Sequence, residues 1–450
     1  MSEVENTSFE ERLQRLMTSL EASLYEEATS QLADLHSAEI ACLLESVPPK
    51  DRIKLWLDID SATQGDILKD LNEDVLSQLL SEMSVTDIVK ATESLDMDDL
   101  ADIVPELPES ALHNLLLTLD HKHRDRLKQV LSYPEDSAGG LMNIDMITVR
   151  DDVHVRTVIR YLRLLKEMPI DTDQVFVVDR SFQYIGAIYI STLLTNEAEQ
   201  SIKPLINSEL KPVLAKTSEA EVASLFEQRD LISAPVVDEN NQLIGRITID
   251  DVVDVIRDEA EHSVMSMAGL DEEDDVFAPV IQSTKSRSIW LGVNLVTVFV
   301  AVFFIGLFEA TLQEKIALAV LMPVVASMGG IAGTQTLILV TRGIATGRVT
   351  HSNLKVLMSK EVAIGFLNGV LWSVVIGLAT YVWFADLILS FVIALAIVVN
   401  LIFAAFSGAF LPSLLIRFKI DPALAGGVIL TTITDVIGFV AFLGLASLVI

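Results

Sequence analysis

The sequence predicts a multidomain membrane protein: an all-α superhelical N-terminal domain, a duplicated α+β region, an amphipathic connecting helix and a C-terminal α-helical bundle of five membrane spans. Three observations lead to this fold class. The 450 residues are 51% hydrophobic, and yet they include 63 acids against 32 bases. The charges are segregated, since only six acids and nine bases lie from Thr284 onward. The acidic part also contains an internal duplication. Its negative charge disfavours nucleic acid as a partner and attracts cations.

Residues 1–133 are predicted to form an acidic helical domain. Apolar residues recur there at helical spacing, and prolines and polar residues divide the pattern into short helices. The stretches LLESVPPKDR and DIVPELPESA echo one another, as expected for a small helical solenoid. Acids gather along these helices, among them Asp98 and Asp102 in the stretch DDLAD. Taken alone, such a cluster is more often a solvated face than a binding site.

A strand–turn–strand pattern occurs twice, 59 residues apart. The first copy contains VFVVD and IGAI, and the second contains APVVD and IGRI, each behind an amphipathic helix. These motifs resemble a tandem pair of CBS domains, the first at 134–199 and the second at 200–258. CBS pairs are generally regulatory modules that pack face to face and often bind adenine nucleotides. The resemblance therefore implies ATP as a candidate ligand of the pair, with a purely structural scaffold as the alternative.

Residues 251–283 are predicted to form an amphipathic helix and an acidic linker. Asp251, Asp254, Asp258 and Glu261 share one helical face, opposite an apolar stripe. Acids at these spacings repel one another. A solvated linker helix would explain the pattern. The position of the helix, between the duplicated module and the first membrane span, favours a role in control instead.

The membrane domain is expected over residues 284–450. Five apolar runs are long enough to cross a bilayer, where helices alone satisfy the backbone of a single segment. Bases lie ahead of the first run and in the loops after the second and fourth runs. The positive-inside rule therefore puts the N-terminus in the cytoplasm and the C-terminus outside. The runs cover about 289–308, 316–341, 362–384, 387–416 and 423–449.

Asp435 is the one charge between Asp421 and the C-terminus, close to the middle of the last run. A carboxylate at that depth costs about 2.5–3.5 kcal/mol, so it requires a cation, a wet cavity or a buried partner. The second run contains SMGGIAGTQT, whose small and polar residues suit a bent helix lining a water-filled path. Close helix packing would explain many of these glycines, and a structural hydrogen bond would explain Asp435.

The residue types favour a cation path and no enzyme. The sequence contains no Ser/His/Asp set, no CxxC, no HExxH and no phosphate-binding glycine loop. One carboxylate with hydroxyls and carbonyls is an oxygen-only environment, which argues against copper and zinc. A single aspartate per subunit, doubled by a two-fold axis, suits a mostly hydrated Mg²⁺. This chemistry alone leaves calcium, manganese and monovalent cations as alternatives.

Nearly the whole chain resembles the MgtE-type magnesium channels, most specifically in MPVVASMGGIAGTQT, DPALAGG and TTITDVIGF. The resemblance implies a homodimer in a bacterial inner (plasma) membrane, with the pore on the dimer axis. It implies that Asp435 is the pore carboxylate, that the carbonyl of Thr431 faces the same ion, and that Asp421 meets the connecting "plug" helix. The regulatory cation-binding positions implied in the same way are Asp251, Asp254 and Glu259 in the plug helix, Asp98 and Asp102 in the N-domain and, as a weaker match, Asp230.

The sequence departs from the family pattern at three places. Ile331 and Ala332 stand where many members carry Asn and Thr, His262 and Ser263 stand where some carry further plug acids, and Ala220 replaces a CBS acid. We expect a Mg²⁺-selective uptake channel that is gated by cytoplasmic Mg²⁺ on its acidic faces. The alternative is a gradient-coupled secondary transporter of Mg²⁺ or other divalent cations such as Co²⁺, although no inverted repeat is visible. A membrane-anchored sensor is a further alternative, for which five spans and a midplane aspartate are excessive.

Overall fold

The computed structural model describes residues 9–449, apart from positions 23, 33, 34, 93, 94, 96, 120, 166, 167, 170 and 271–274. The chain forms two compact units. The segregation of charge seen in the sequence corresponds to this division. The first unit comprises Met1–Ala260 with Glu273–Pro279, and the second comprises Glu261–Glu272 with Val280–Ile450.

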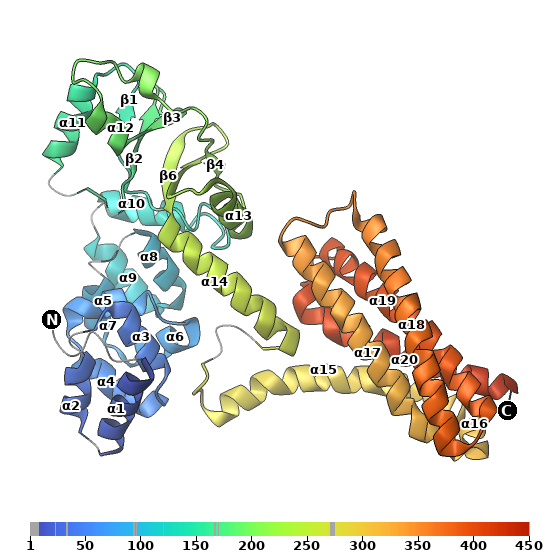
Figure 1. The fold of residues 1–450 in the computed structure, drawn as a ribbon. Helices are drawn as coiled ribbons and strands as arrows, with labels where there is room; N and C mark the ends of the chain where they lie inside the picture. The colour runs from blue at the N-terminus through green and yellow to red at the C-terminus, as the bar shows by residue number, and fades with distance from the viewer. Residues whose placement is uncertain are drawn as a thin grey trace. The chain divides into compact units, whose positions relative to one another are not determined.

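The first unit begins with a stack of short helices (Figure 1). Pro49 occupies the first turn of α4, where its missing N–H is not needed. The apolar faces of the helices meet in one core, which includes the fully buried Leu55 and Trp56. The helices are α1 (Phe9–Glu21), α2 (Tyr25–Leu32), α3 (Ser37–Glu45), α4 (Pro49–Asp58), α5 (Ser61–Leu68), α6 (Glu73–Glu82), α7 (Val85–Thr92), α8 (Met97–Ile103), the 3₁₀ turn η2 (Val104–Glu106), α9 (Glu109–Thr118) and α10 (His121–Val130).

A buried ion pair attaches the segment 275–279 to these helices. Arg52 is 0% exposed and donates to both carboxylate oxygens of Asp275, at 2.8 and 3.1 Å. Its remaining N–H groups donate to the carbonyls of Leu44 and Val47 and to the Gln78 side chain. Because every charge is paired, the cost of burying the guanidinium is offset. The chain that enters the first long helix is therefore anchored to the N-terminal helices.

The α+β region contains two three-stranded sheets with the same topology. In each sheet the first two strands are parallel and the last two antiparallel. The register shifts after Val177 in one sheet and after Val236 in the other, which are equivalent positions of the 59-residue repeat. The elements are β1 (Thr148–Arg150), α11 (Val155–Leu164), β2 (Gln174–Val178), β3 (Tyr184–Tyr189) and α12 (Ile190–Thr195), then η3 (Lys203–Leu205), β4 (Val213–Leu214), α13 (Glu219–Arg229), β5 (Ser233–Val237) and β6 (Leu243–Thr248).

The connecting helix α14 (Ile249–Met265) starts directly after β6, and the 3₁₀ turn η4 (Ser266–Ala268) follows it. Near its start, the Thr248 hydroxyl donates to the Asp251 carboxylate at 3.0 Å. Val252 and Val255 are buried, whereas Ile256 and Val264, which share the predicted apolar stripe with Val252, are exposed. The helix is continuous and passes from the first unit into the second.

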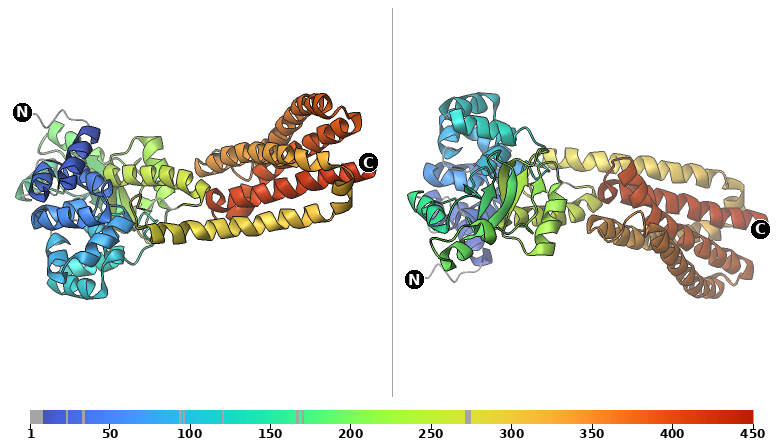
Figure 2. Two further views of the ribbon diagram at one scale, coloured as in Figure 1. Left: turned by 90° about the horizontal axis from the view of Figure 1, so that it is seen from below. Right: turned by 90° about the horizontal axis from the view of Figure 1, so that it is seen from above.

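The second unit is a bundle of long helices (Figure 2). Among the described residues, five helices are long and apolar enough to cross a membrane. Helix α19 lies at the centre, with α17, α18 and α20 packed on it, while α15 packs along α20. The first long helix begins at Val280 rather than near 289. The helices are α15 (Val280–Gly306), the short α16 (Glu309–Glu314), α17 (Ile316–Ala345), α18 (Leu354–Phe384), α19 (Leu387–Arg417) and α20 (Pro422–Val449).

Candidate cation-binding sites

Asp435 lies in a groove between α20 and α17. The carboxylate is half-buried, and Thr431 lies one turn before it on the same wall of the groove. The groove has a volume of about 530 Å³. The residues of α17 that line the groove are spaced three or four positions apart, with neighbours beside them. They therefore share one face of that helix. The residues of this α17 wall are Ala326, Ser327, Gly330, Ile331, Thr334, Gln335 and Ile338.

Every polar group that lines this groove is an oxygen ligand or an amide. The Thr431 hydroxyl donates to the Gly427 carbonyl at 2.8 Å, and the Thr434 hydroxyl donates to the Thr431 carbonyl at 3.0 Å. Asp435 is the only charged residue among those that line the groove. Over the described positions, no three His, Cys, Asp or Glu side chains are placed to hold one metal ion. A single chain therefore offers one carboxylate, which suits a cation that keeps most of its waters.

A second hollow, of about 660 Å³, shares Thr334 and Thr431 with the groove. It is also lined by Arg287 and Trp290 of α15 and by residues 267–270. Gly269 has a φ of +70°, and a Cβ atom there would lie 2.8 Å from Cγ of Trp290. Only glycine fits both the backbone conformation and the indole ring, so this turn depends on that residue.

Asp421 caps the N-terminus of α20 and contacts α14. Its carboxylate accepts hydrogen bonds from the backbone N–H groups of Ala423 and Leu424, at 2.9 and 3.2 Å. The Nε2 atom of His262 lies 3.2 Å from its Oδ2, and the Ser266 hydroxyl lies 3.2 Å from the same ring nitrogen. Asp421 thus meets the connecting helix. Its partner there is a histidine, at a position where the sequence departs from the family pattern.

An acidic cleft of about 660 Å³ lies within the first unit. It is formed by α8, by the chain before α6, by residues 135–141 and by the starts of α13 and α14. One base, Lys69, lines it, and its ammonium lies 3.1 Å from the Asp99 carboxylate. The acids that line it are Asp70, Glu73, Asp99, Asp102, Glu135, Asp136, Glu219, Asp250, Asp251, Asp254 and Asp258.

Crowding makes several of these carboxyls harder to ionise. Partial burial raises the pKa of Asp254 although its side chain is 59% exposed, and the neighbouring acids Asp258 and Asp250 raise it further, against the effect of Arg257. Burial also raises the pKa of Glu219, and Asp136 adds to that shift. Because charged carboxylates here repel one another, a divalent cation between them would reduce that repulsion.

The cleft contains some of the residues implied by the family resemblance and not others. Asp102, Asp251 and Asp254 line it. Glu259 is exposed beside it and contributes to the raised pKa of Glu219. Asp230 lies outside the lining, where it ends α13 in a left-handed conformation with φ 51°. Asp98 is in α8, but its side chain lies outside the described residues.

Sequence reasoning did not select several acids of the cleft. Glu135 and Asp136 lie in the loop before β1, and Glu73 starts α6, so none belongs to a helical stripe or a motif. Asp250 precedes the stripe on α14 by one residue. The high local density of acids was the one signal in the sequence. That signal does not distinguish acids that line a cleft from acids on a solvent-exposed face.

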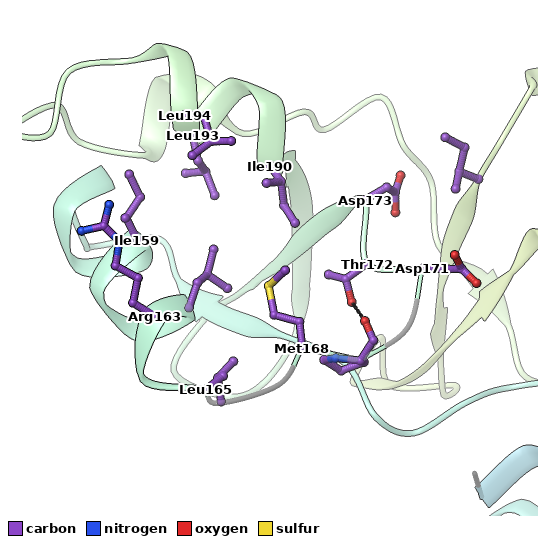
Figure 3. A pocket seen from close by; sticks show the side chains of 13 residues that line it. Ile159, Arg163, Leu165, Met168, Asp171, Thr172, Asp173, Ile190, Leu193 and Leu194 are labelled. Atoms are coloured by element: carbon purple, nitrogen blue, oxygen red, sulfur yellow. Dashed lines mark hydrogen bonds between the residues drawn. The ribbon is translucent and has the colours of Figure 1, made fainter. Parts of the chain in front are cut away.

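A pocket of about 890 Å³ lies mainly in the first α+β repeat, with Ile232 of the second repeat also lining it (Figure 3). Its walls are apolar side chains from α11 and α12, among them Ile159 and Leu193. Asp171, Thr172 and Asp173 edge it just before β2, and Arg163 adds a guanidinium from α11. An apolar pocket with a few polar groups at its edge is the usual form of a small-molecule site.

Five apolar helices with a carboxylate-bearing groove, joined to an acidic module with duplicated α+β repeats, define a cation-transporting membrane protein. The family model described as a divalent cation transporter matches residues 322–445. The model of the MgtE intracellular N domain matches 35–136, and that of the CBS domain matches 202–258.

Curated relatives extend this likeness over the whole chain. The magnesium transporter MgtE of Thermus thermophilus is 31% identical, over 97% of this chain and 99% of the relative. Those of Enterococcus faecalis and Bacillus subtilis are 30% and 27% identical, each over 99% of this chain and 98% of the relative. The chain therefore belongs to the MgtE family of magnesium transporters.

Two solved structures are each similar to part of this chain. One described as the cytosolic domain of the Mg²⁺ channel MgtE in complex with ATP is 25% identical, with a TM-score of 0.49, and covers 54% of this chain and 99% of its own. One described as the soluble part of a magnesium transporter is 25% identical, with a TM-score of 0.47.

Family membership confirms the predicted fold class, Mg²⁺ transport and the expectation that the chain is not an enzyme. The chain is a multi-pass membrane protein.

Proposed function

We propose that the protein is a Mg²⁺-selective uptake channel whose ion path is the groove between α17 and α20. The observation that carries this proposal is Asp435, an acid of an apolar helix that lines a groove together with the hydroxyls of Thr431 and Thr334. A groove with a fixed carboxylate lets a hydrated cation pass by exchanging weak contacts. Thr431 and Thr334 supply oxygens beside it on the two walls.

The proposed assembly is a homodimer. The groove lies open on one chain and offers a single carboxylate, so a two-fold axis along it would place two Asp435 side chains around one path. Two carboxylates with retained waters are a coordination environment that suits Mg²⁺. The bases in the loops after the second and fourth spans favour a cytoplasmic N-terminus in a bacterial inner membrane, with the C-terminus outside.

The proposed closing signal is cytoplasmic Mg²⁺ in the acidic cleft. Without cations the acids of α8 and α14 repel one another, so the cleft opens; with Mg²⁺ bound between them it closes. Asp251 and Asp254 lie on the cleft part of α14, and His262 of the same helix contacts Asp421 at the start of α20. The helix α14 thus contributes both to the acidic cleft and to the contact with Asp421. Moving a gate from 1:99 to 99:1 takes roughly 5.5 kcal/mol of differential binding, which several weak sites supply together.

We further propose the pocket of the first CBS repeat as the place where ATP binds. Its apolar walls suit the flat base, and the carboxylates of Asp171 and Asp173 suit ribose hydroxyls. Arg163 is the base at its edge for the phosphates.

Mg²⁺ flux into liposomes that contain the purified protein tests the channel. We expect flux to follow the Mg²⁺ gradient and the membrane potential, and to be the same after ionophores collapse any Na⁺ or H⁺ gradient. A channel needs no second gradient, since the ion moves down its own. Flux that disappears when either of those gradients is removed would instead establish a secondary transporter.

The cleft is also expected to respond to pH. Asp254, Glu219 and Asp70 have pKa values raised from 3.8, 4.5 and 3.8, mainly by burial. A carboxyl whose pKa is raised in the compact form destabilises that form when the pH is above the raised pKa. This penalty disappears as the pH falls from the raised pKa to the ordinary pKa of the carboxyl. In Mg²⁺-free buffer the cleft should therefore become more closed as the pH falls from neutral toward about 4, the ordinary carboxyl range.

Distances between spin labels on α6 and α13 measure that closure. The Asp254→Asn variant should show a smaller pH dependence, because one of the titrating carboxyls is gone. Glu197→Gln, which removes an exposed acid outside the cleft, is the matched control. Equal pH dependence in all three proteins would contradict the role of the cleft.

A further inference from the structure

The groove face of α17 is held from behind by two polar side chains on helices that do not line the groove. Asn400 of α19 is 0% exposed, and its Nδ2 donates to the Val325 carbonyl at 2.8 Å. Glu361 of α18 is 6% exposed, and the Thr336 hydroxyl lies 3.4 Å from its Oε2. Val325 immediately precedes Ala326, where the groove wall begins, and Thr336 immediately follows Gln335. The two contacts therefore bracket most of this wall.

Glycines on both groove helices make room for Asn400. A Cβ atom on Gly329 of α17 would lie 2.3 Å from its Nδ2, and a Cβ on Gly438 of α20 would lie 2.8 Å from the same atom. Gly329 is one turn after Val325, and Gly438 is three residues after Asp435. The amide of Asn400 thus lies between α17 and α20, the two helices that form the groove.

This arrangement has a cost that packing alone does not explain. The Oδ1 atom of Asn400 is buried without a hydrogen-bond partner among the described residues. Burying a polar atom without a partner is unfavourable, and a leucine of similar size would avoid the cost. What leucine cannot do is donate to the backbone of α17. The contact therefore sets where α17 sits.

Glu361 reaches α17 past the central helix. A Cβ atom on Gly365, one turn later on α18, would lie 2.7 Å from the Leu401 carbonyl of α19, so α18 lies very close to that helix. A Cβ on Gly408 of α19 would lie 2.9 Å from Cβ of Thr336. Because Gly365 and Gly408 have no side chains, the helices approach closely enough for the Glu361 carboxyl to contact the Thr336 hydroxyl. Lys360, whose ammonium is 3.9 Å from Glu361, is largely exposed.

We propose that Asn400 and Glu361 are positioning residues that set the discrimination between ions in the groove without touching the ion. They fix the rotation and depth of the α17 wall opposite Asp435. A hydrated ion contacts the walls through its waters, so the spacing between Asp435 and Thr334 determines which hydrated ion fits. This inference rests on the proposed function, because it takes the groove as the ion path.

The test compares Mg²⁺ and Ca²⁺ flux in liposomes for Asn400→Leu, which keeps the number and branching of the side-chain heavy atoms and loses the donor. We expect the Mg²⁺-to-Ca²⁺ ratio to fall about five- to tenfold, the size of one lost hydrogen bond. Ser390→Ala is the matched control, since it removes a buried hydroxyl of α19 that donates to the Asp386 carbonyl. The ratio should be unchanged in that variant. An unchanged ratio in folded Asn400→Leu would overturn the role of Asn400.

A double-mutant cycle keeps the inference testable if Asn400→Leu does not fold. Gly329→Ala should lower the ratio by itself, because the new methyl displaces the Asn400 amide. Asn400→Ala combined with Gly329→Ala should be no worse than Asn400→Ala alone, since the displaced group is gone. Strictly additive losses would show that the two positions act separately, and would count against the proposal.

Glu361 is tested with a conservative pair of variants. Glu361→Gln retains a group that can bond to Thr336 and removes the charge, whereas Glu361→Leu removes both. Positioning predicts a nearly normal ion ratio in the first and a reduced ratio in the second. Equal losses in both variants would assign the effect to the charge and overturn the positioning role.

The Asp435→Asn variant separates this inference from the proposed function. If that variant keeps full flux, the groove is not the ion path and the proposed function fails. If it loses flux while Asn400→Leu and Glu361→Leu keep the wild-type ratio, the positioning inference alone fails.

Discussion

The Asp435→Asn variant is expected to transport Mg²⁺ at least about a hundredfold more slowly than the wild type at equal protein content. Among the described residues, Asp435 is the only charged one that lines the groove, so its loss leaves a cation with neutral oxygens alone. A hydrogen bond to a charged group contributes about 1.5–3 kcal/mol, and each 1.4 kcal/mol is a factor of ten. In a two-fold dimer both copies are lost together.

Liposome flux with a Mg²⁺-sensitive dye measures this effect. Glu314→Gln, which removes an exposed acid of the membrane domain outside the groove, is the control and should transport normally. Asp435→Glu should retain part of the flux, because the charge persists at a shifted position. Undiminished flux in Asp435→Asn would mean that the ion takes another path.

Neutralising Asp251 and Asp254 together is expected to leave the channel open at internal Mg²⁺ concentrations that close the wild type. Both carboxylates line the acidic cleft from α14, and Asp254 faces the repulsion of Asp258 and Asp250. Their loss removes the ligands through which Mg²⁺ would bridge the cleft, and we expect this to outweigh the repulsion that is lost with the two charges. A partly exposed ion pair contributes up to about 1 kcal/mol, so the loss of two should raise the closing midpoint by up to roughly thirtyfold.

The measurement is flux, or open probability in patches, against internal Mg²⁺. The double variant Glu197→Gln with Glu227→Gln is matched in charge and lies outside the cleft lining, so its midpoint should equal the wild type. If the Asp251→Asn, Asp254→Asn protein closes at the same Mg²⁺ concentration as the control, the cleft does not control the gate.

The apolar helices could be predicted well from hydropathy, and their ends less well. The first was expected from about 289, and the helix begins at Val280. Residues 280–288 include Lys285 and Arg287. These residues are compatible with a helix, but their charge interrupts the apolar run. Hydropathy reports the part of a helix that suits lipid, whereas backbone hydrogen bonding determines where the helix begins.

Composition and spacing alone could not predict the acidic cleft as a site, although the family resemblance implied three of its acids, Asp102, Asp251 and Asp254. Its acids come from distant parts of the chain, with Asp70 and Asp258 at the two extremes. Along the sequence each cluster has the composition of a solvated face. Folding brings α8 and α14 to the same cleft, and the raised pKa values of Asp70 and Asp254 exist only after that approach.

The sequence by itself determined the segregation of charge, the 59-residue duplication, the five apolar helices and Asp435 as the carboxylate in the last of them. Each of these follows from local composition or spacing, because burial in lipid and helical periodicity act on neighbouring residues. The tertiary structure alone decided which face of α17 stands opposite Asp435, that His262 meets Asp421, and that Asn400 lies between two glycines. These depend on distances between side chains far apart in the chain, which only the packing of whole helices can set.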